Sequence, residues 1–338
     1  MPTRIGAEPK AAWRAVPRAV RSQVEGLVGA RVARALRVWG GYAPSPTFRV
    51  FLADGRRVFF KGVDRTSNEH MRRALEAEER VYRELGCWLR PWAPEFHGSF
   101  RVAGWHVLLL EDLGPARIPP WTSAAVRRAM AGYAAFHRHS LGHDLPDWLS
   151  RRRHHAFALT WSRLGDEPGG LENLAALAGA RSIEALAWTR AALPRLRAAA
   201  EGLAEVGPPH ALLHFDTRCD NLRLQPGGRL RLFDWPYTCV GPCEFDVAAF
   251  AQSITCEGGP DAEAALADYA AHLPVRQEVV DAAVAAVAGY FAQQAWREPI
   301  PGLPRLRQVQ RCQLRASLTW CARRLHLPAP DWLVALQP

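Results

Sequence analysis

Two short apolar runs that each end in an acidic residue constrain this chain more than any other feature. The first leads into His214-Phe215-Asp216, with Asn221 five residues after the aspartate, and the second (residues 230–233) ends at Asp234. A Pro-Gly-Gly sequence (226–228) separates them. Apolar runs on either side of a glycine-bearing turn predict a hairpin. Such a hairpin would bring the polar ends of both strands together.

These side chains have the chemistry that phosphoryl transfer requires. Carboxylate and amide oxygens are the ligands that Mg²⁺ prefers, so Asn221 and Asp234 are candidate metal ligands. Asp216 is the candidate for orienting an attacking hydroxyl and accepting its proton. Lys61, distant in the sequence, could hold the α- and β-phosphates of a nucleotide, and Glu78 could pair with it.

The first third of the chain has the pattern of an antiparallel sheet. Residues 48–52 and 57–63 are apolar runs joined by residues 53–56, which contain the Asp-Gly pair of a hairpin turn. Lys61 lies on the second run. Further elements are expected as a cap helix opening at Pro17, a helix over 66–85, and strands over 96–100 and 106–110.

After Glu111-Asp112-Leu113-Gly114 the pattern becomes mostly helical, beginning with a helix over 125–139. We therefore expect an α+β, bilobal, protein-kinase-like fold. Residues 1–112 would form a small antiparallel-sheet lobe with the cap helix, and residues 113–338 a larger, mainly helical lobe.

The order of these motifs resembles the aminoglycoside phosphotransferase and choline kinase superfamily, the small-molecule branch of the protein-kinase-like fold. The resemblance covers roughly residues 30 to 260. It rests on His214-Phe215-Asp216-(x4)-Asn221, Leu232-Phe233-Asp234-Trp235, Asp246 within 244–248, Lys61 within 58–61, and the hinge 109–113.

The resemblance implies a role for each matching residue. Asp216 would be the catalytic base, and Asn221 and Asp234 the metal ligands. Lys61, aimed by Glu78, would contact the nucleotide phosphates.

It also implies roles around this centre. Backbone groups near Glu111 and Leu113 would bind the nucleotide base, and Arg218 would stabilise the transferring charge. His214 and Asp246 would hold the loop by hydrogen bonds.

Several positions depart from the pattern of such kinases. Phe215 stands where the family usually has glycine and protein kinases have arginine. Asp234-Trp235-Pro236 replaces Asp-Phe-Gly, and the glycine loop from Gly40 to Pro46 contains two prolines. No Ala-Pro-Glu segment follows. These departures disfavour a protein kinase.

The net charge of +10 raises the alternative of a nucleic-acid or membrane-surface binder. Residues 1–64 hold twelve lysines and arginines against four acids, so most of the excess is local. No basic stripe interleaved with aromatic residues is visible. No long apolar run or secretory signal occurs, and the seven scattered cysteines fit a reducing compartment. We expect a cytoplasmic protein without a nucleic-acid or membrane partner; the sequence leaves the oligomeric state open.

The leading hypothesis is an ATP- or GTP-dependent and Mg²⁺-dependent O-phosphotransferase. Its acceptor would be a hydroxyl of a small molecule such as an aminoglycoside-like antibiotic, an amino alcohol or a related metabolite. The alternatives are a catalytically inactive nucleotide-binding protein of the same fold and, less favoured, the basic binder. The acceptor would lie against 150–205 and 255–300, which contain the basic run Arg151–Arg153 and the acids Asp166, Glu167, Glu172, Glu257, Asp261, Glu263 and Glu298. Residues 255–261 are either an acidic wall or a turn.

Overall fold

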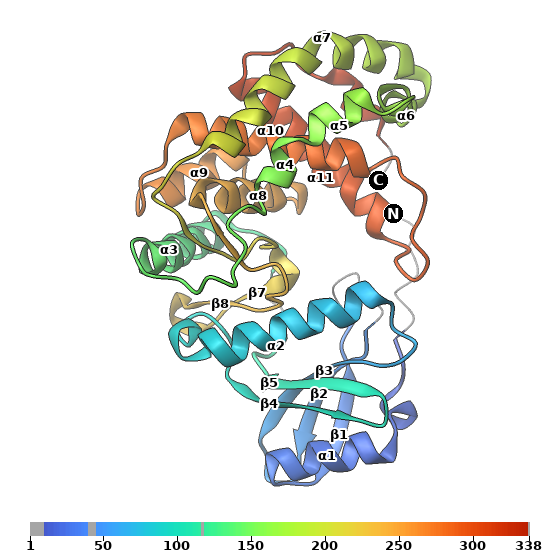
Figure 1. The fold of residues 1–338 in the computed structure, drawn as a ribbon, viewed down its shortest axis with the longest axis vertical. Helices are drawn as coiled ribbons and strands as arrows, with labels where there is room; N and C mark the ends of the chain where they lie inside the picture. Colours follow the sequence, from blue (N-terminus) through green and yellow to red (C-terminus); the bar gives the residue numbers. More distant parts are fainter. Residues whose placement is uncertain (1–9, 40–44, 116–117, 337–338) are drawn as a thin grey trace.

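The computed structural model describes residues 10–39, 45–115 and 118–336. The first lobe contains a five-stranded antiparallel sheet in the order β1-β2-β3-β5-β4. Its elements are α1 (Arg18–Val28), β1 (Val32–Arg37), β2 (Thr47–Leu52), β3 (Arg57–Val63), α2 (Glu69–Leu89), β4 (Phe96–Val102) and β5 (Trp105–Glu111). Figure 1 shows α1 on one side of the sheet and α2 on the side that faces the helical lobe.

The two helices cover the sheet because each has one apolar face. Val20 and Val24 of α1 are buried in a cluster with Phe48 and Phe60 of the central strands. Leu75 of α2 is buried against the opposite face. The Asn68 side chain caps α2 by accepting a hydrogen bond from the Met71 amide at 2.9 Å. The helix ends at Leu89, four residues beyond the predicted end.

The second lobe is mainly helical and has a separate, larger core. Its helices are α3 (Ser123–Ser140), α4 (His155–Ala158), α5 (Thr160–Asp166), α6 (Gly170–Ala176), α7 (Ser182–Glu201), α8 (Cys243–Cys256), α9 (Ala262–Ala270), α10 (Gln277–Gln294) and α11 (Leu306–Arg324). Two short antiparallel pairs complete it: β6 (Ala211–Leu213) with β9 (Cys239–Gly241), and β7 (Leu222–Leu224) with β8 (Leu230–Leu232). The central helices α8 and α10 are apolar on most sides because other helices surround them.

The predicted bilobal α+β fold is therefore confirmed, and so is the predicted hairpin β7–β8. Strand β9 was not predicted from the sequence. A lobe boundary after residue 112 stays a prediction; it lies between β5 and α3. Residues 40–44 of the glycine loop lie outside the described residues. Within the described part, no helix combines the length and apolar character needed to cross a membrane.

Candidate active site

The β7–β8 hairpin brings Asn221 and Asp234 together as its sequence predicted. Leu222 pairs with Leu232, and the Phe233 amide donates to the Asn221 carbonyl at 3.0 Å. Asp234 follows with a φ of +69°, a left-handed conformation that is uncommon outside glycine. The hairpin therefore fixes both side chains at one end of the strand pair.

Lys61 of β3 links the sheet lobe to this hairpin. Its Nζ donates to Glu78 Oε2 at 2.5 Å and to Asp234 Oδ1 at 2.6 Å. Burial alone would lower the pKa of Lys61, but the charges of Asp234 and Glu78 outweigh it and raise the pKa above its usual value. Conversely, Lys61 holds the pKa of the Asp234 carboxyl below its usual value, although burial opposes this. Lys61 is thus a fully charged bridge between the lobes.

The register of α2 selects Glu78 over its neighbour. Glu78 is buried against Lys61, whereas Glu79 accepts a hydrogen bond from Arg83 at 2.9 Å and contacts His106 at 2.7 Å. Consecutive helical residues point about 100° apart, so only one of the two can face β3. Burial raises the pKa of Glu78, and Lys61 opposes that rise.

Asp216 and Asn221 are joined across the loop that precedes β7. Asn221 Nδ2 donates to the Asp216 carbonyl at 2.8 Å and to Asp216 Oδ2 at 3.0 Å. The guanidinium of Arg218 lies 3.5 Å from Asp216 Oδ2 and 3.0 Å from Asp220 Oδ1. Burial raises the pKa of Asp216 to about 7, with Arg218 opposing the rise and Asp234 and Asp220 adding to it. The side chain still keeps 30% exposure, so it is accessible to a ligand.

The buried carboxylate of Asp246, near the start of α8, holds the beginning of this loop. Its Oδ2 accepts from the His214 amide at 2.7 Å, and its Oδ1 accepts from the Phe215 amide at 2.8 Å. His214 Nδ1 accepts from the Asp216 amide at 3.3 Å, so Nε2 carries the proton and donates to the Phe233 carbonyl at 3.0 Å. Burial lowers the pKa of His214, which keeps it neutral in this arrangement.

Helix α3 supplies partners of Asp246 that sequence reasoning missed. Tyr133 donates its hydroxyl to Asp246 Oδ2 at 2.6 Å, and His137 Nε2 lies 3.3 Å from the same oxygen. The Tyr133 hydroxyl also lies 2.6 Å from Thr217 Oγ1. Tyr133 and His137 are four residues apart and therefore share one face of the helix, and this pair of polar residues was the sequence signal that could have revealed the contact with Asp246.

Phe215 occupies its position at a conformational cost. Its φ is +70°, where glycine is favoured and a side chain with Cβ is strained. Its ring stacks on Phe245 at 4.8 Å and meets Phe157 edge-on at 5.3 Å. These contacts, with the Asp246 hydrogen bond to the Phe215 amide, explain how phenylalanine is accommodated there.

The hinge residues are arranged around the end of β5. The Glu111 amide donates to the Glu95 carbonyl at 2.8 Å, and the Glu111 carboxylate accepts from Arg231 of β8 at 2.5 Å. Leu113 follows, half-buried, in the connection toward α3. The side chain of Glu111 therefore ties the two lobes together.

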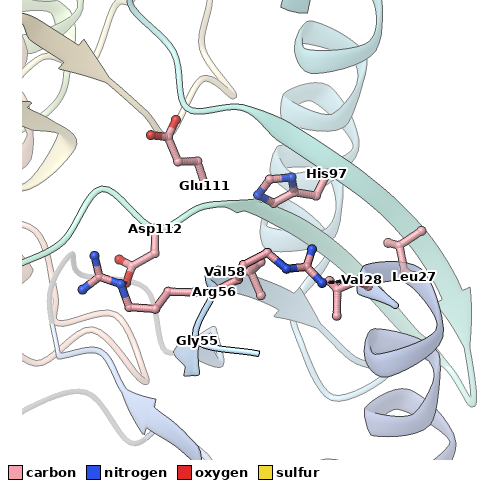
Figure 2. Close-up of a pocket in the computed structure, with 9 residues that line it drawn as sticks. Leu27, Val28, Gly55, Arg56, Val58, His97, Glu111 and Asp112 are labelled. Carbon is pink, nitrogen blue, oxygen red and sulfur yellow. Dashed lines mark hydrogen bonds and ion pairs between the residues drawn. The ribbon is translucent and has the colours of Figure 1, made fainter. Parts of the chain in front are cut away.

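A cavity lined by Glu111 and Asp112 of the hinge lies between α1 and the β2–β3 turn. Figure 2 shows the Glu111 and Asp112 carboxylates at one end and Leu27 and Val28 of α1 at the other. None of the residues that line this cavity belongs to the Lys61, Asp234 and Asp216 cluster. It is therefore separate from the candidate active site.

The cluster can accept a divalent cation that arrives with a ligand. Asn221 uses its amide nitrogen for Asp216, and Asp234 uses Oδ1 for Lys61, so each retains an oxygen that has no hydrogen-bond partner among the described residues. Among the described residues, no three or more His, Cys, Asp or Glu side chains gather as a metal cage. This donor set suits Mg²⁺, which is usually held by one or two carboxylates plus substrate phosphates.

The sequence matches a model of the phosphotransferase enzyme family over residues 34–279. A comparison with curated proteins finds no match.

Solved structures of similar fold include a spectinomycin phosphotransferase in complex with ADP and spectinomycin (12% identity, TM-score 0.56, 89% of this chain and 97% of that chain). An aminoglycoside phosphotransferase from Alicyclobacillus acidocaldarius is similar at 15% identity and TM-score 0.56, over 94% of this chain and 97% of that one. A choline kinase from Streptococcus pneumoniae is similar at 14% identity and TM-score 0.54, over 91% and 98%. At these identities the likeness concerns the fold. Because the family match spans most of the sequence and the fold agrees with it, the chain belongs to the phosphotransferase enzyme family.

Proposed function

We propose that the protein transfers the γ-phosphoryl group of Mg-ATP or Mg-GTP to a hydroxyl group of a small molecule. The observation that carries this proposal is the contact of Lys61 with both Glu78 and Asp234, next to the Asp216–Asn221 pair. A lysine, a metal-ligating pair and a loop aspartate are the parts from which kinase-like phosphotransferases are built. The family assignment supports the same reaction class.

Lys61 binds the α- and β-phosphates in this proposal. Lys61 can bind phosphate without losing all its protein contacts. Glu78 can keep its ion pair with Lys61 while phosphate oxygens replace Asp234. Asp234 would then be available to hold the cation. A compact ammonium suits this exchange better than the planar fork of an arginine.

The base of the nucleotide would contact backbone groups near Glu111 and Leu113. The Glu111 amide is already committed to the Glu95 carbonyl. The nucleotide base would therefore contact other main-chain groups of residues 111–113.

The chemistry that a bound Mg²⁺ would supply here is neutralisation of the negative charge on the phosphoryl groups. Asn221, through its unused amide oxygen, and Asp234, through Oδ2, would hold the ion.

Asp216 receives the proton of the acceptor hydroxyl. The hydroxyl oxygen forms a bond to the γ-phosphorus, its proton passes to the Asp216 carboxylate, and the bond to the bridging oxygen of the nucleotide breaks. A pKa of about 7 matches the range in which general bases work best. Arg218, 3.5 Å from Asp216 Oδ2, is placed to stabilise negative charge on the transferring group.

The test is release of ADP or GDP from Mg-nucleotide in the presence of a panel of hydroxyl compounds. Asp216→Ala should reduce transfer by about 10²-fold or more, the usual contribution of a general base. Binding of a non-hydrolysable Mg-nucleotide, measured by calorimetry, should persist. Asp144→Asn, an exposed position on a loop, is the matched control. Full turnover by Asp216→Ala on an accepted substrate would refute the assignment.

A further inference from the structure

The seven acids in the segments expected to line the acceptor site nearly all have protein partners. Five of the seven pair with arginines: Asp166 with Arg197, Glu167 with Arg297, Glu172 with Arg190, Asp261 with Arg323, and Glu263 with Arg324. Glu257 accepts from Trp121 Nε1 at 2.7 Å and from the Cys219 amide at 3.3 Å. The exposed Glu298 meets Arg307 through its main-chain carbonyl. Residues 255–261 are therefore the end of α8 and the turn that follows it, and Glu257 contacts the 216–221 loop at the Cys219 amide.

Two tyrosines of the helical lobe are linked by ring contacts to Phe215, which precedes Asp216: Tyr237 through Arg153, and Tyr290 through Phe157. Burial raises the pKa of Tyr237 to about 12, and the negative charge of Asp216 contributes to the rise. Burial and the same charge raise the pKa of Tyr290. Tyr290 also packs on Phe157 at 4.9 Å, and Phe157 contacts Phe215, which precedes the aspartate. Both tyrosines are half-buried and within electrostatic reach of Asp216.

Arg153 lies against the first of these tyrosines. Its guanidinium is 5.7 Å from the centre of the Tyr237 ring and 5.8 Å from that of Phe215. Among the described residues it has no ion-pair partner, and its Nε is buried without a hydrogen-bond partner. An arginine held by aromatic faces beside the loop aspartate retains its hydrogen-bonding fork for a ligand.

Arg307, in the first turn of α11, contacts α10 one helical turn after Tyr290, through the carbonyl of Gln294. It donates to the carbonyls of Glu298 and Gln294 and to Gln310 Oε1, which are all uncharged acceptors. Burial lowers the pKa of Arg307, with Tyr290 opposing and the nearby Arg297 adding to the effect. Its positive charge is therefore not neutralised by a protein carboxylate among the described residues.

We propose that the acceptor of the phosphoryl group carries a carboxylate or phosphate, which is bound by Arg153 and Arg307 while Tyr237 and Tyr290 pack against its carbon frame. The inference rests on the proposed function and names the acceptor class of the same site. A polycationic acceptor would have to approach two unneutralised guanidinium groups without a free acidic wall to offset them.

The test compares acceptors of matched size in the presence of Mg-ATP. Hydroxycarboxylates and sugar phosphates form two anionic arms, free sugars a neutral arm, and amino alcohols and aminoglycosides a cationic arm. We expect transfer to an anionic arm, and the two anionic arms distinguish a carboxylate from a phosphate. Arg153→Gln and Arg307→Gln should each lower kcat/KM for that acceptor by about 10- to 100-fold, the value of one charge-assisted hydrogen bond.

Arg152→Gln is the matched control, because this neighbouring arginine is exposed and its side chain forms no hydrogen bond or ion pair with the described residues. It should leave kcat/KM unchanged, while Arg153→Lys should restore part of the loss by returning the charge. Preferential transfer to the cationic arm, with no loss in Arg153→Gln or Arg307→Gln, would overturn the anionic acceptor and leave the phosphotransferase proposal standing. Absence of Asp216-dependent nucleotide consumption with every arm would overturn both.

Discussion

The carboxylate of Asp246 accepts four hydrogen bonds in the core of the helical lobe, so Asp246→Asn should be costly. Three donors converge on Oδ2: the His214 amide, the Tyr133 hydroxyl and His137 Nε2. The Phe215 amide donates to Oδ1. An asparagine can keep its oxygen toward the three donors only by turning its amide nitrogen toward the Phe215 amide, which then loses its acceptor.

The expected loss of stability follows from these contacts. A buried N–H without a partner costs about 1–3 kcal/mol, and a hydrogen bond that changes from ionic to neutral loses about 1 kcal/mol. Removing a buried charge returns part of its desolvation cost. We therefore expect Asp246→Asn to lower the free energy of unfolding by about 3–4 kcal/mol, a large share of the stability of a typical domain.

Urea denaturation followed by tryptophan fluorescence measures this change, with Asp144→Asn as the exposed control. The midpoint should fall without a change in slope, because the surface exposed on unfolding is the same. The folded fraction of the variant should lose kcat more than nucleotide affinity, since Asp246 positions residues 214–216 and not Lys61. A loss below about 0.5 kcal/mol would refute the reasoning that Asp246 organises this loop.

Three further perturbations test other parts of the site and fold. Glu78→Gln should lower kcat/KM for Mg-nucleotide by about tenfold or more, since a charge-assisted contact to Lys61 is lost. Glu76→Gln, on the exposed side of α2, should leave kcat/KM unchanged. Phe215→Gly should destabilise by about 1 kcal/mol, because relief of about 1–2 kcal/mol of left-handed strain is outweighed by lost ring contacts; a gain in urea midpoint would show that strain dominates. Burial, with the charges of His155 and His210, lowers the pKa of His154 to about 4. Since the pKa in the unfolded chain is near 6.5, the free energy of unfolding should fall as pH drops from about 6.5 toward 4, by up to about 3 kcal/mol. His154→Phe should abolish this component of the pH dependence. If the variant lost as much stability between pH 7 and 4.5 as the parent protein does, the prediction would be wrong.

Local sequence was sufficient wherever chain geometry leaves few choices. Asn221 and Asp234 are joined by a short hairpin, so alternating strand geometry and one turn fix their approach. Lys61 and Glu78 are separated by a single strand-to-helix connection, and the helical register then brings one glutamate to the lysine. The same reasoning predicted the order of the sheet and helical lobes.

Contacts between distant segments were not predictable in this way. Tyr133 and His137 lie more than 100 residues before Asp246, and their pairing depends on how α3 packs against α8. Strand β9 has only three residues, Cys239–Gly241, and exists because β6 offers it an edge. Its sequence carries no alternation long enough to distinguish a strand from a loop.

The excess of basic residues acts differently from what composition alone suggests. Although most of the basic excess lies in residues 1–64, many carboxylates in the helical lobe pair with an arginine. The acids beside the 216–221 loop are opposed by cations too, Asp216 and Asp220 by Arg218 and Asp234 by Lys61. Few carboxylates then remain to neutralise a cationic substrate. The basic excess that would suggest a polyanion partner lies mainly in residues 1–64, whereas the proposed choice of a small acceptor depends on Arg153 and Arg307 of the helical lobe.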